Sequence, residues 1–547
     1  MYESSTVGIA LIVALVVLSV ISYCSNWQLR WQFRNIPGPT PKFPLGNLAE
    51  IQRKQRFKAY ADWGKQYGDT YKVFFVRQPI IVTTDPNLVR QITVKDFNKF
   101  HDRFGAQATE RSVLSGPRLE AAEAGMISAR GSFWGSLRAG VQPMFHSTHL
   151  TAYADTINQA VDDFAVNLDK IAEAGEEVDM FRQLGRLTMQ VIGAAAFGVK
   201  FETQQAANAE EIPLVTAAKT VFDSSDPSFW SLSALVVPRP LLPVIKLLAR
   251  KFPSKLMQKS QNAFETLYDA SNALIENSRR AHHSDSEEPA PWKWFPGDPN
   301  NPYKDTVPAE NSVISMLMKA NNKATGTPLT QLQIAAQTNT MMLAGYETTA
   351  NTLAFSVYLL GKHPQAQQRL LQEVDHFQGR PTYDSLPSFP YAAAVINEAL
   401  RLYPPGTVLA RVTTDDVQLG PYFLPKGTGV HIDLVAMQHD ERYWEDAEAF
   451  KPERWIGDKT GGDRTGGLAY LPFGVGPRMC VGIKLALEEA VIALVRLHQR
   501  YTFKLSEKLL TGPLEVKHGL TMSPKGGLPV TVMRRPNSKA TAAAAGA

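Results

Sequence analysis

Residues 473–482 read Phe-Gly-Val-Gly-Pro-Arg-Met-Cys-Val-Gly, so that Cys480 stands among glycines, an aromatic residue and an arginine. The chain has one other cysteine, Cys24. Apolar residues recur at helical spacing over 483–494 and predict a helix that begins just after Cys480. The unpaired N–H groups and the dipole at a helix start stabilise negative charge, and metal coordination also favours a thiolate. The run is therefore typical of a chain that presents one thiolate to one metal ion.

The residues around Cys480 suit a flat ligand that carries carboxylates. Gly474, Gly476 and Gly482 let the backbone approach such a ligand closely. Phe473 can cover the sulfur, and the guanidinium fork of Arg478 is suited to carboxylates. The competing interpretation is a buried structural cysteine in a glycine-rich turn. An isolated cysteine would favour that interpretation, whereas the other motifs of this chain favour a metal ligand.

A helical pattern over residues 327–360 predicts a helix of ~50 Å, long enough to cross a whole domain. Its centre, residues 344–349, reads Ala-Gly-Tyr-Glu-Thr-Thr. Glycine costs ~1 kcal/mol inside a helix, and a threonine hydroxyl can bond the carbonyl four residues earlier and bend the helix. Gly345 and Thr348 therefore predict a point where the helix opens over a small ligand. The alternative is a helix packed through small residues, with Glu347 in solvent.

Two further patterns complete the set of motifs. Glu398 and Arg401 are three residues apart and share one helix face, and residues 452–455 read Pro-Glu-Arg-Trp. With the cysteine run and residues 344–349, they resemble the cytochrome P-450 family, the haem-thiolate monooxygenases, along nearly the whole chain. The resemblance is to the eukaryotic microsomal type, with a fungal source as a hypothesis. It implies a mainly α (α-rich α+β) fold, a helical prism with small β-sheets, around haem (iron protoporphyrin IX) with Cys480 as the axial thiolate.

The resemblance also implies roles for single residues. Thr348 would hydrogen-bond dioxygen at the iron and Glu347 would relay protons from solvent, so these two are the expected catalytic residues. The expected haem contacts are Trp134, Arg138, Arg411, Phe473, Arg478 and Gly482. Many relatives carry a basic residue directly after the tryptophan, but this chain has Gly135 there, with Arg130 as a candidate substitute.

By resemblance, Glu398, Arg401 and Arg454 form a buried brace behind the haem loop. By spacing alone, Glu398 and Arg401 would be an ordinary surface pair that contributes ~0–1 kcal/mol. We therefore expect a structural rather than a catalytic role for the three residues. His439 is also expected to be structural and not an iron ligand, because the cysteine motif is unbroken.

The N-terminal segment predicts a membrane anchor. Residues 7–23 are predominantly apolar and, at ~1.5 Å per residue, are long enough for a thin bilayer. A cleaved signal peptide is the alternative, but residues 1–6 contain Glu3 and no Lys or Arg. The basic residues that follow predict a single-pass protein of the endoplasmic reticulum membrane with a cytosolic catalytic domain. The expected divisions are an anchor at 1–25, a Pro-rich linker at 26–45, the haem-thiolate monooxygenase domain at 46–536 and a disordered tail at 537–547.

Local patterns predict the remaining elements. Helical patterns dominate residues 150–280, residues 101–130 lack periodicity and predict a long loop, and the polar, Pro-rich residues 283–308 predict a surface loop. Further helices are expected from Pro364 and over 391–403. Short β-branched and aromatic runs predict strands at 70–76, 79–83, 408–412, 417–423 and 428–432.

Composition and motifs indicate which classes of partner to expect. The chain has 547 residues and a net charge of +5 with dispersed Lys and Arg, so no nucleic-acid partner is expected. By resemblance the pocket is lined mostly by apolar residues, which favours a hydrophobic small-molecule substrate. Residues 234–255, apolar and basic, are either a second contact with membrane lipid or an amphipathic helix against the core. No flavin-type Gly-x-Gly-x-x-Gly segment is visible, so electrons are expected from a separate NADPH-dependent flavoprotein reductase.

The expected function is therefore insertion of one oxygen atom of O2 into a hydrophobic small molecule, in secondary metabolism. One alternative is a haem-thiolate isomerase or dehydratase on the same fold, and another is a non-catalytic haem carrier or sensor. Neither alternative needs an organised acid–alcohol pair, so the adjacent Glu347 and Thr348 argue against both.

Overall fold

The computed structural model describes residues 17, 27–103, 110–114, 117–201, 203–204, 212–224, 228–282, 303, 306–310, 312–321, 326–457 and 467–536. The predicted anchor at 1–25, except Val17, and the predicted tail at 537–547 lie outside the described residues, as does most of the predicted loop at 283–308. Within the described ranges, no helix combines the length and the apolar character needed to cross a bilayer.

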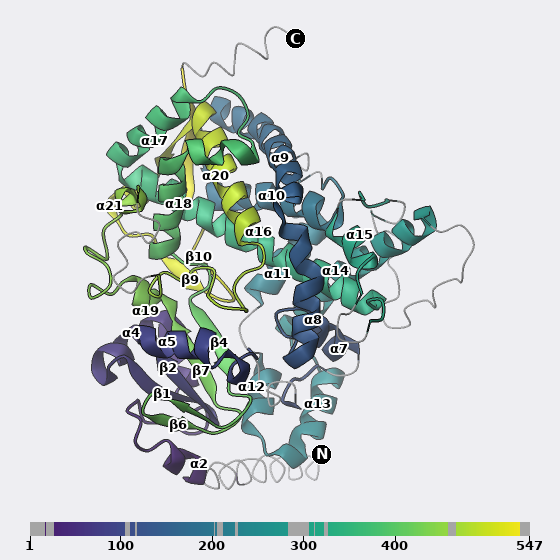
Figure 1. Cartoon of the computed structure of the whole chain (residues 1–547), viewed down its shortest axis with the longest axis vertical. Coiled ribbons are helices and arrows are strands. Elements are labelled where there is room, and N and C mark those ends of the chain that lie inside the picture. Colours follow the sequence, from purple (N-terminus) through teal and green to yellow (C-terminus); the bar gives the residue numbers. More distant parts are fainter. Residues whose placement is uncertain are drawn as a thin grey trace, which may run out of the picture.

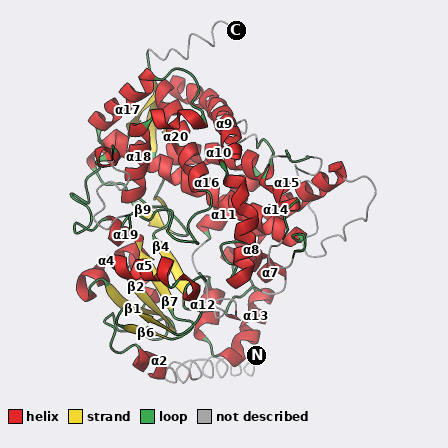
Figure 2. Cartoon of the chain, viewed as in Figure 1, coloured by secondary structure: helices red, strands yellow, loops and turns green. Residues whose placement is uncertain are grey.

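Helices form most of the molecule and the strands form small sheets, which confirms the predicted mainly α fold (Figure 2). The α-helices before residue 300 are α2 (Trp27–Gln32), α3 (Leu48–Lys54), α4 (Arg56–Tyr67), α5 (Pro86–Arg90), α7 (Pro117–Ala124), α8 (Gly131–Val141), α9 (Ser147–Ala174), α10 (Met180–Ile192), α11 (Pro213–Asp223), α12 (Phe229–Val236), α13 (Leu242–Lys251) and α14 (Lys255–His282). Those after it are α15 (Val313–Met318), α16 (Gln331–Lys362), α17 (Pro364–His376), α18 (Pro390–Leu402), α19 (Leu434–Gln438), α20 (Ile483–Arg500) and α21 (Glu507–Thr511). Short 3-10 or π turns are η1 (Gln91–Lys95), η2 (Phe97–Lys99), η3 (Gln142–Phe145), η4 (Gly193–Phe197), η6 (Arg239–Leu241), η7 (Tyr383–Ser388) and η8 (Pro452–Trp455).

The strands of the described residues form four sheets, ordered β1-β2-β7-β4, β3-β11-β8, β5-β6 and β10-β9. Their bounds are β1 (Thr70–Phe75), β2 (Gln78–Thr83), β3 (Glu177–Asp179), β4 (Val408–Val412), β5 (Val417–Leu419), β6 (Tyr422–Leu424), β7 (Gly429–Asp433), β8 (Tyr501–Leu505), β9 (Val516–His518), β10 (Met522–Pro524) and β11 (Pro529–Arg534). β1 and β2 pair antiparallel, which confirms the strand pair predicted at 70–83. β2 then pairs with β7, and β7 with β4, so one sheet joins segments more than 300 residues apart.

The long helix α16 lies near the centre of the molecule (Figure 1). Thr330 and Gln333 cap its start reciprocally, so the helix begins a few residues later than the predicted 327 and ends at Lys362. Its first half, with Ile334 and Met342, packs in one hydrophobic core, and its second half, with Leu353 and Leu360, packs in another. The predicted break at 344–349 therefore falls between two separate apolar cores.

Two predicted elements are wrong in part. Residues 101–130 were expected to form a loop, but they contain α7, which packs on α16 and buries Ala121 and Ala124. Small alanines gave this helix no clear apolar stripe in the sequence. The strand expected at 417–423 is instead the hairpin β5–β6, because Gly420, with φ of +53°, reverses the chain between the two strands.

The segment predicted as a linker packs against the domain. Phe33 and Ile36 are buried in a core with β1 and β2, and the Lys72 N–H donates to Pro37 O at 2.8 Å. The chain between α2 and α3 is therefore fixed to the edge of the sheet.

Candidate functional site

Cys480 stands in the turn that leads into α20. Its N–H donates to Phe473 O at 2.8 Å, which closes the loop that precedes the helix. Gly482 is the capping residue and α20 begins at the next residue, so the predicted position of the thiol at a helix start is confirmed. α20 packs on α9, α16 and α18, which fixes the loop relative to the centre of the molecule.

The glycines of the Cys480 loop serve a packing contact within the protein. Gly476 has φ of +75°, and a Cβ atom there would lie 2.1 Å from Thr93 O in η1. Gly474 also has a positive φ, of +72°, and the Leu409 side chain lies 3.5 Å from its Cβ position. Only glycine allows this loop to approach η1 so closely.

The Cys480 thiol faces a recess. The residue is exposed to solvent, yet the surrounding protein desolvates the thiol and raises its pKa. The Gly482 N–H and the positive charges of Arg138 and Arg103 act in the opposite direction and favour the thiolate. A side chain that is both accessible and desolvated lies in a cavity rather than on an outer surface.

Arg478 is held almost completely inside the protein beside this loop. Its Nε, Nη1 and Nη2 donate to the carbonyls of His101, Met126 and Ala129 at 2.7, 3.1 and 2.7 Å. The guanidinium stacks over the Trp134 ring, 4.1 Å from its centroid. Burial lowers the pKa of Arg478 to about 9, and neighbouring Arg103 and Arg411 contribute.

Three more arginines converge on the same region. Arg138, one turn after Trp134 on α8, donates to Met479 O at 2.6 Å, and Arg103 donates to Arg478 O at 3.2 Å. Arg411 on β4 is buried, and its Nε has no hydrogen-bond partner among the described residues. Burial, with the nearby Arg103, lowers the pKa of Arg411 to about 9. The result is a group of cations in which Arg411 and Arg478 are buried and Arg103 and Arg138 are half-buried, and such a group is costly unless an anion joins it.

Arg130, the candidate substitute for the basic residue that many relatives carry after the tryptophan, already forms an ion pair with Glu123. Its Nη2 lies 2.6 Å from Glu123 Oε1. An acid, Asp102, lies beside the arginine group, 3.8 Å from Arg478, and accepts from the Gly131 N–H at 2.9 Å. Sequence reasoning missed Asp102 and Arg103, because they lie in a stretch without periodicity and no local motif marks them.

Thr348 and Glu347 lie at the centre of α16, between the two cores. The Thr348 hydroxyl donates to Ala344 O at 2.6 Å, which confirms the predicted bond to the carbonyl four residues earlier. The helix nevertheless stays continuous, and Gly345 serves close packing, because a Cβ there would lie 2.7 Å from Ile192 Cδ1. Ala344 is exposed although it lies mid-helix, so a recess borders α16 at this point.

Glu347 is buried and not solvated. Its Oε1 accepts a hydrogen bond from the Thr521 hydroxyl at 2.6 Å. Burial raises the pKa of Glu347, and the Thr521 bond and the charge of Lys517 offset this only in part. A carboxyl in this state keeps a proton to higher pH than a solvated one, as a proton donor requires.

The expected brace is present. Arg401 donates to both oxygens of Glu398 at 3.0 and 2.9 Å, and Arg454 donates to Oε1 at 3.1 Å. Arg401 also binds the carbonyls of Gln438, Ala447 and Ala449. Burial alone would raise the pKa of Glu398, but its two arginine partners outweigh burial and lower it. Because both members of the central pair are fully buried, this trio is structural, as predicted.

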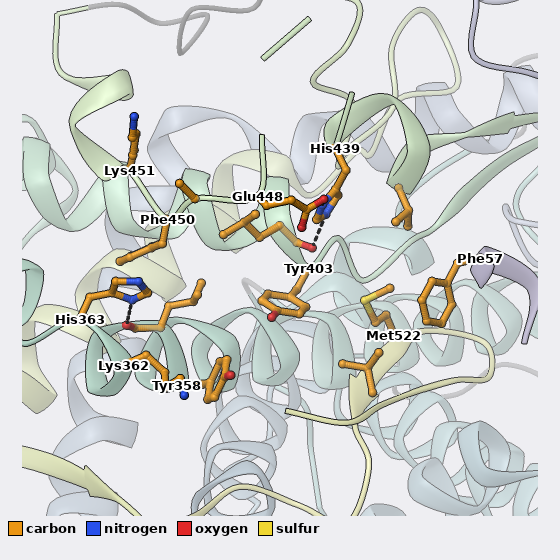
Figure 3. A pocket seen from close by; sticks show the side chains of 15 residues that line it. Phe57, Tyr358, Lys362, His363, Tyr403, His439, Glu448, Phe450, Lys451 and Met522 are labelled. Atoms are coloured by element: carbon orange, nitrogen blue, oxygen red, sulfur yellow. Dashed lines mark hydrogen bonds and ion pairs between the residues drawn. The ribbon is translucent and has the colours of Figure 1, made fainter. Parts of the chain in front are cut away.

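A pocket of about 530 Å³ lies apart from this site, between the C-terminal ends of α16 and α18, α19 and the β9–β10 hairpin (Figure 3). Its lysine, histidine and glutamate side chains are already paired. Lys362 donates to three backbone carbonyls at 2.8–3.2 Å, and His439 bridges Glu448 and Leu402 O. His439 is thus structural, as predicted, and we assign no chemistry to this pocket despite its size.

The family comparisons agree with this geometry. The family model described as Cytochrome P450 matches residues 36–529. Cytochrome P450 3A9 of Rattus norvegicus is 30% identical over 501 residues, 90% of each chain, and cytochrome P450 3A5 of Homo sapiens is 30% identical over 501 residues with the same coverage. Cytochrome P450 3A16 of Mus musculus is 30% identical over 539 residues, 93% of this chain and 96% of that protein. The chain therefore belongs to the cytochrome P450 family, haem-thiolate monooxygenases that bind haem iron through a cysteine thiolate.

Proposed function

We propose that this protein is a membrane-anchored monooxygenase of secondary metabolism that inserts one oxygen atom of O2 into a hydrophobic small molecule. Electrons come from a separate NADPH-dependent flavoprotein reductase. The observation that carries the proposal is the accessible Cys480 thiol, which faces a recess at the start of α20 beside a group of buried arginines.

Haem fits the side chains that surround this recess. Cys480 would hold the haem iron through its thiolate, because its position at a helix start favours that form. The two propionates are complementary to Arg138, Arg411 and Arg478, and the unpartnered Nε of Arg411 is one donor that such an anion would satisfy. Trp134 and Phe473 would add apolar contacts, and Gly482 leaves space at the helix start, where its Cβ position lies 3.4 Å from Phe145.

When bound, haem with a thiolate ligand supplies the activation of dioxygen, because the thiolate favours O–O cleavage. The chain's own contribution is control of protons and water. Glu347 holds a proton on a buried carboxyl, and the Thr348 hydroxyl lies on the adjacent position of α16. A positioned acid of this kind contributes ~10²–10⁴-fold to a proton-transfer step.

Substitution of Thr348 tests this function. Thr348→Ala should lower product formed per NADPH consumed, because proton delivery loses its hydroxyl. Thr352→Ala is a matched control, since Thr352 makes the same type of bond one turn later, to Thr348 O at 2.8 Å. Unchanged coupling in Thr348→Ala would argue against the oxygen-activation role.

Cys480→Ser should lose the thiolate signature in the reduced carbon-monoxide spectrum.

The surface supports membrane attachment. Trp31, Phe229, Leu247, Phe252 and Phe423 are large apolar side chains that are each more than half exposed. Figure 1 shows the elements at or near these residues, α2, α12, α13 and β6, at the same end of the molecule. Such a surface suits the headgroup region of a bilayer next to an N-terminal anchor at 1–25 in the endoplasmic reticulum. A hydrophobic substrate dissolved in that bilayer would enter from the same side.

A further inference from the structure

A small hollow lies on the side of Glu347 that is lined by the β9–β10 hairpin. Its volume is about 110 Å³, and it is bounded by the end of α11, the centre of α16 and the hairpin. At ~30 Å³ for each molecule, it has room for about four waters. Asp223 and Lys517 line it, together with Glu347, Thr521 and Ser523.

The inner end of the hollow is polar and buried. The Thr521 hydroxyl donates to Glu347 and accepts from Asn351 Nδ2 at 3.4 Å. Ser523, only 1% exposed, lines the hollow, and its Oγ has no hydrogen-bond partner among the described residues. Asn351 Oδ1 is also buried and has no hydrogen-bond partner among the described residues. Because buried polar atoms pair with protein or with ordered water, these atoms mark positions for water.

The outer end reaches solvent. Asp223 at the end of α11 and Lys517 on β9 form an ion pair of 2.8 Å, and their side chains are 44% and 48% exposed. Exposure therefore falls steeply from the ion pair at the outer end to Glu347, which is 8% exposed, at the inner end. The hollow connects the surface to one buried carboxyl.

We propose that this hollow is the water-filled route by which protons reach Glu347 from solvent, with Thr521 as its positioning residue and Asp223–Lys517 as its outer end. The proposal rests on the proposed function, because it takes Glu347 as the acid. The step moves one proton from water in the hollow to the Glu347 carboxylate, and bulk solvent returns a proton to that water. No electrons are transferred in it.

The charges that face Glu347 suit this role. Burial has the largest effect on the pKa of Glu347 and raises it, whereas Lys517 lowers this pKa and Asp223 raises it, so the two members of the ion pair act in opposite directions. Tyr346 precedes Glu347 on α16, and burial raises its pKa, so it stays neutral. His518 lies beside Lys517, but burial lowers the pKa of His518 to about 4, so its ring is neutral near pH 7. Glu347 is thus the group at the inner end that can exchange a proton.

Infrared titration of the full-length holoenzyme tests the position of Thr521, with the Glu347 carboxyl band identified by its loss in Glu347→Gln. Thr521→Val should raise the pKa of Glu347, because the charged form loses its hydrogen-bond donor, and Thr521→Ser should restore it. Lys517→Gln should raise the pKa and Asp223→Asn should lower it. A carboxyl band that does not respond to any of these changes overturns the proposal.

Turnover provides the second measurement. Thr521→Val, and separately Asp223→Asn, should lower product per NADPH by roughly threefold or more, a part of the ~100-fold that loss of a positioned acid costs, and should raise the solvent deuterium isotope effect. Thr521→Ser should retain coupling. The control is Lys525→Gln, which breaks the exposed Lys525–Glu515 pair of 3.1 Å beside the same hairpin.

The outcomes separate the two proposals. If Thr348→Ala and Glu347→Gln lower coupling while Thr521→Val, Asp223→Asn and Lys517→Gln do not, the proton route is wrong and the proposed function stands. If Thr348→Ala and Glu347→Gln leave coupling unchanged, the proposed function itself fails. The ion-pair variants are at the surface, so they give a result even if Thr521→Val does not fold.

Discussion

Four arginine side chains near Cys480 carry an electrostatic cost, which the ion pair of 3.8 Å between Asp102 and Arg478 offsets only in part. Arg103, Arg138, Arg411 and Arg478 are held mainly by carbonyl oxygens, and burial lowers the pKa of each. Buried cations of this kind are stabilised when a matched anion binds. We therefore expect that binding of a dicarboxylate cofactor would stabilise the loops around these arginines.

Gly476 provides a test at the residue scale. Gly476→Ala should destabilise the Cys480 loop, because a Cβ atom would lie 2.1 Å from Thr93 O at a φ of +75°. Gly427→Ala is the control, since Gly427 has a similar φ of +86° with no neighbour within 4 Å of its Cβ position. The melting temperature and the haem content should both fall more in Gly476→Ala than in Gly427→Ala. The additional loss in free energy of unfolding should be at least ~1–3 kcal/mol, the cost of a clash added to the strain that both variants share. Equal losses would show that the contact with η1 is unimportant.

The residues that the sequence identified are those that a short pattern marks. Cys480 precedes an apolar stripe, and Glu398 and Arg401 are one turn apart, so the helix start and the pairing followed from local spacing. The burial of the Glu398–Arg401 pair was expected only from the family resemblance. Thr521 could not be predicted, because it reaches Glu347 across 174 residues of sequence and only the folded hairpin brings them together.

At the scale of elements, strands of β-branched residues and helices with capping residues were predicted well. Pro364 starts α17, as the local pattern indicates. α7 was missed because tertiary packing on α16, and not an intrinsic apolar stripe, holds it in place. The accessible Cys480 thiol in its recess and the recess beside Ala344 are also tertiary features, which periodicity alone does not contain.

Helix α20 carries a pH-dependent contribution to stability. Glu488 is 1% exposed, neither carboxylate oxygen has a partner among the described residues, and burial raises its pKa to about 8. In the unfolded chain its pKa is ~4.3. Between these values the folded state binds a proton that the unfolded state releases, so the free energy of unfolding should fall as pH rises from ~4.3 towards about 8.

The check is to compare Glu488→Gln with the wild type in urea unfolding at several pH values. The wild type should lose stability relative to Glu488→Gln by an amount on the order of a few kcal/mol between pH ~5 and ~8. Glu507→Gln on α21, which is exposed, serves as the control. Parallel stability curves for Glu488→Gln and the wild type would show that Glu488 is ionised alike in both states.

At the scale of the whole molecule, the exposed apolar side chains are unevenly distributed. α13 buries Leu242, Ile245 and Ala249 against the core while Val244 and Leu247 stay exposed. The two interpretations of residues 234–255 are therefore compatible, because one face of the helix packs on the core and the opposite face remains apolar. An exposed apolar face is unfavourable in water, whereas a bilayer surface next to α2 would cover it.

Deletion and substitution together test this orientation. Removing residues 1–25 should release most of the protein from vesicles, and the remainder should bind weakly through α13 and its neighbours. In that shortened chain, Leu247→Asp with Phe252→Asp should lower the bound fraction by about tenfold or more, because each side chain contributes ~1.5–3 kcal/mol when fully buried. Leu510→Asp on α21, which Figure 1 places far from α13, is the matched exposed control. If deletion frees none of the protein, the single anchor is wrong, and if Leu510→Asp is as effective as the pair, the membrane faces a different side.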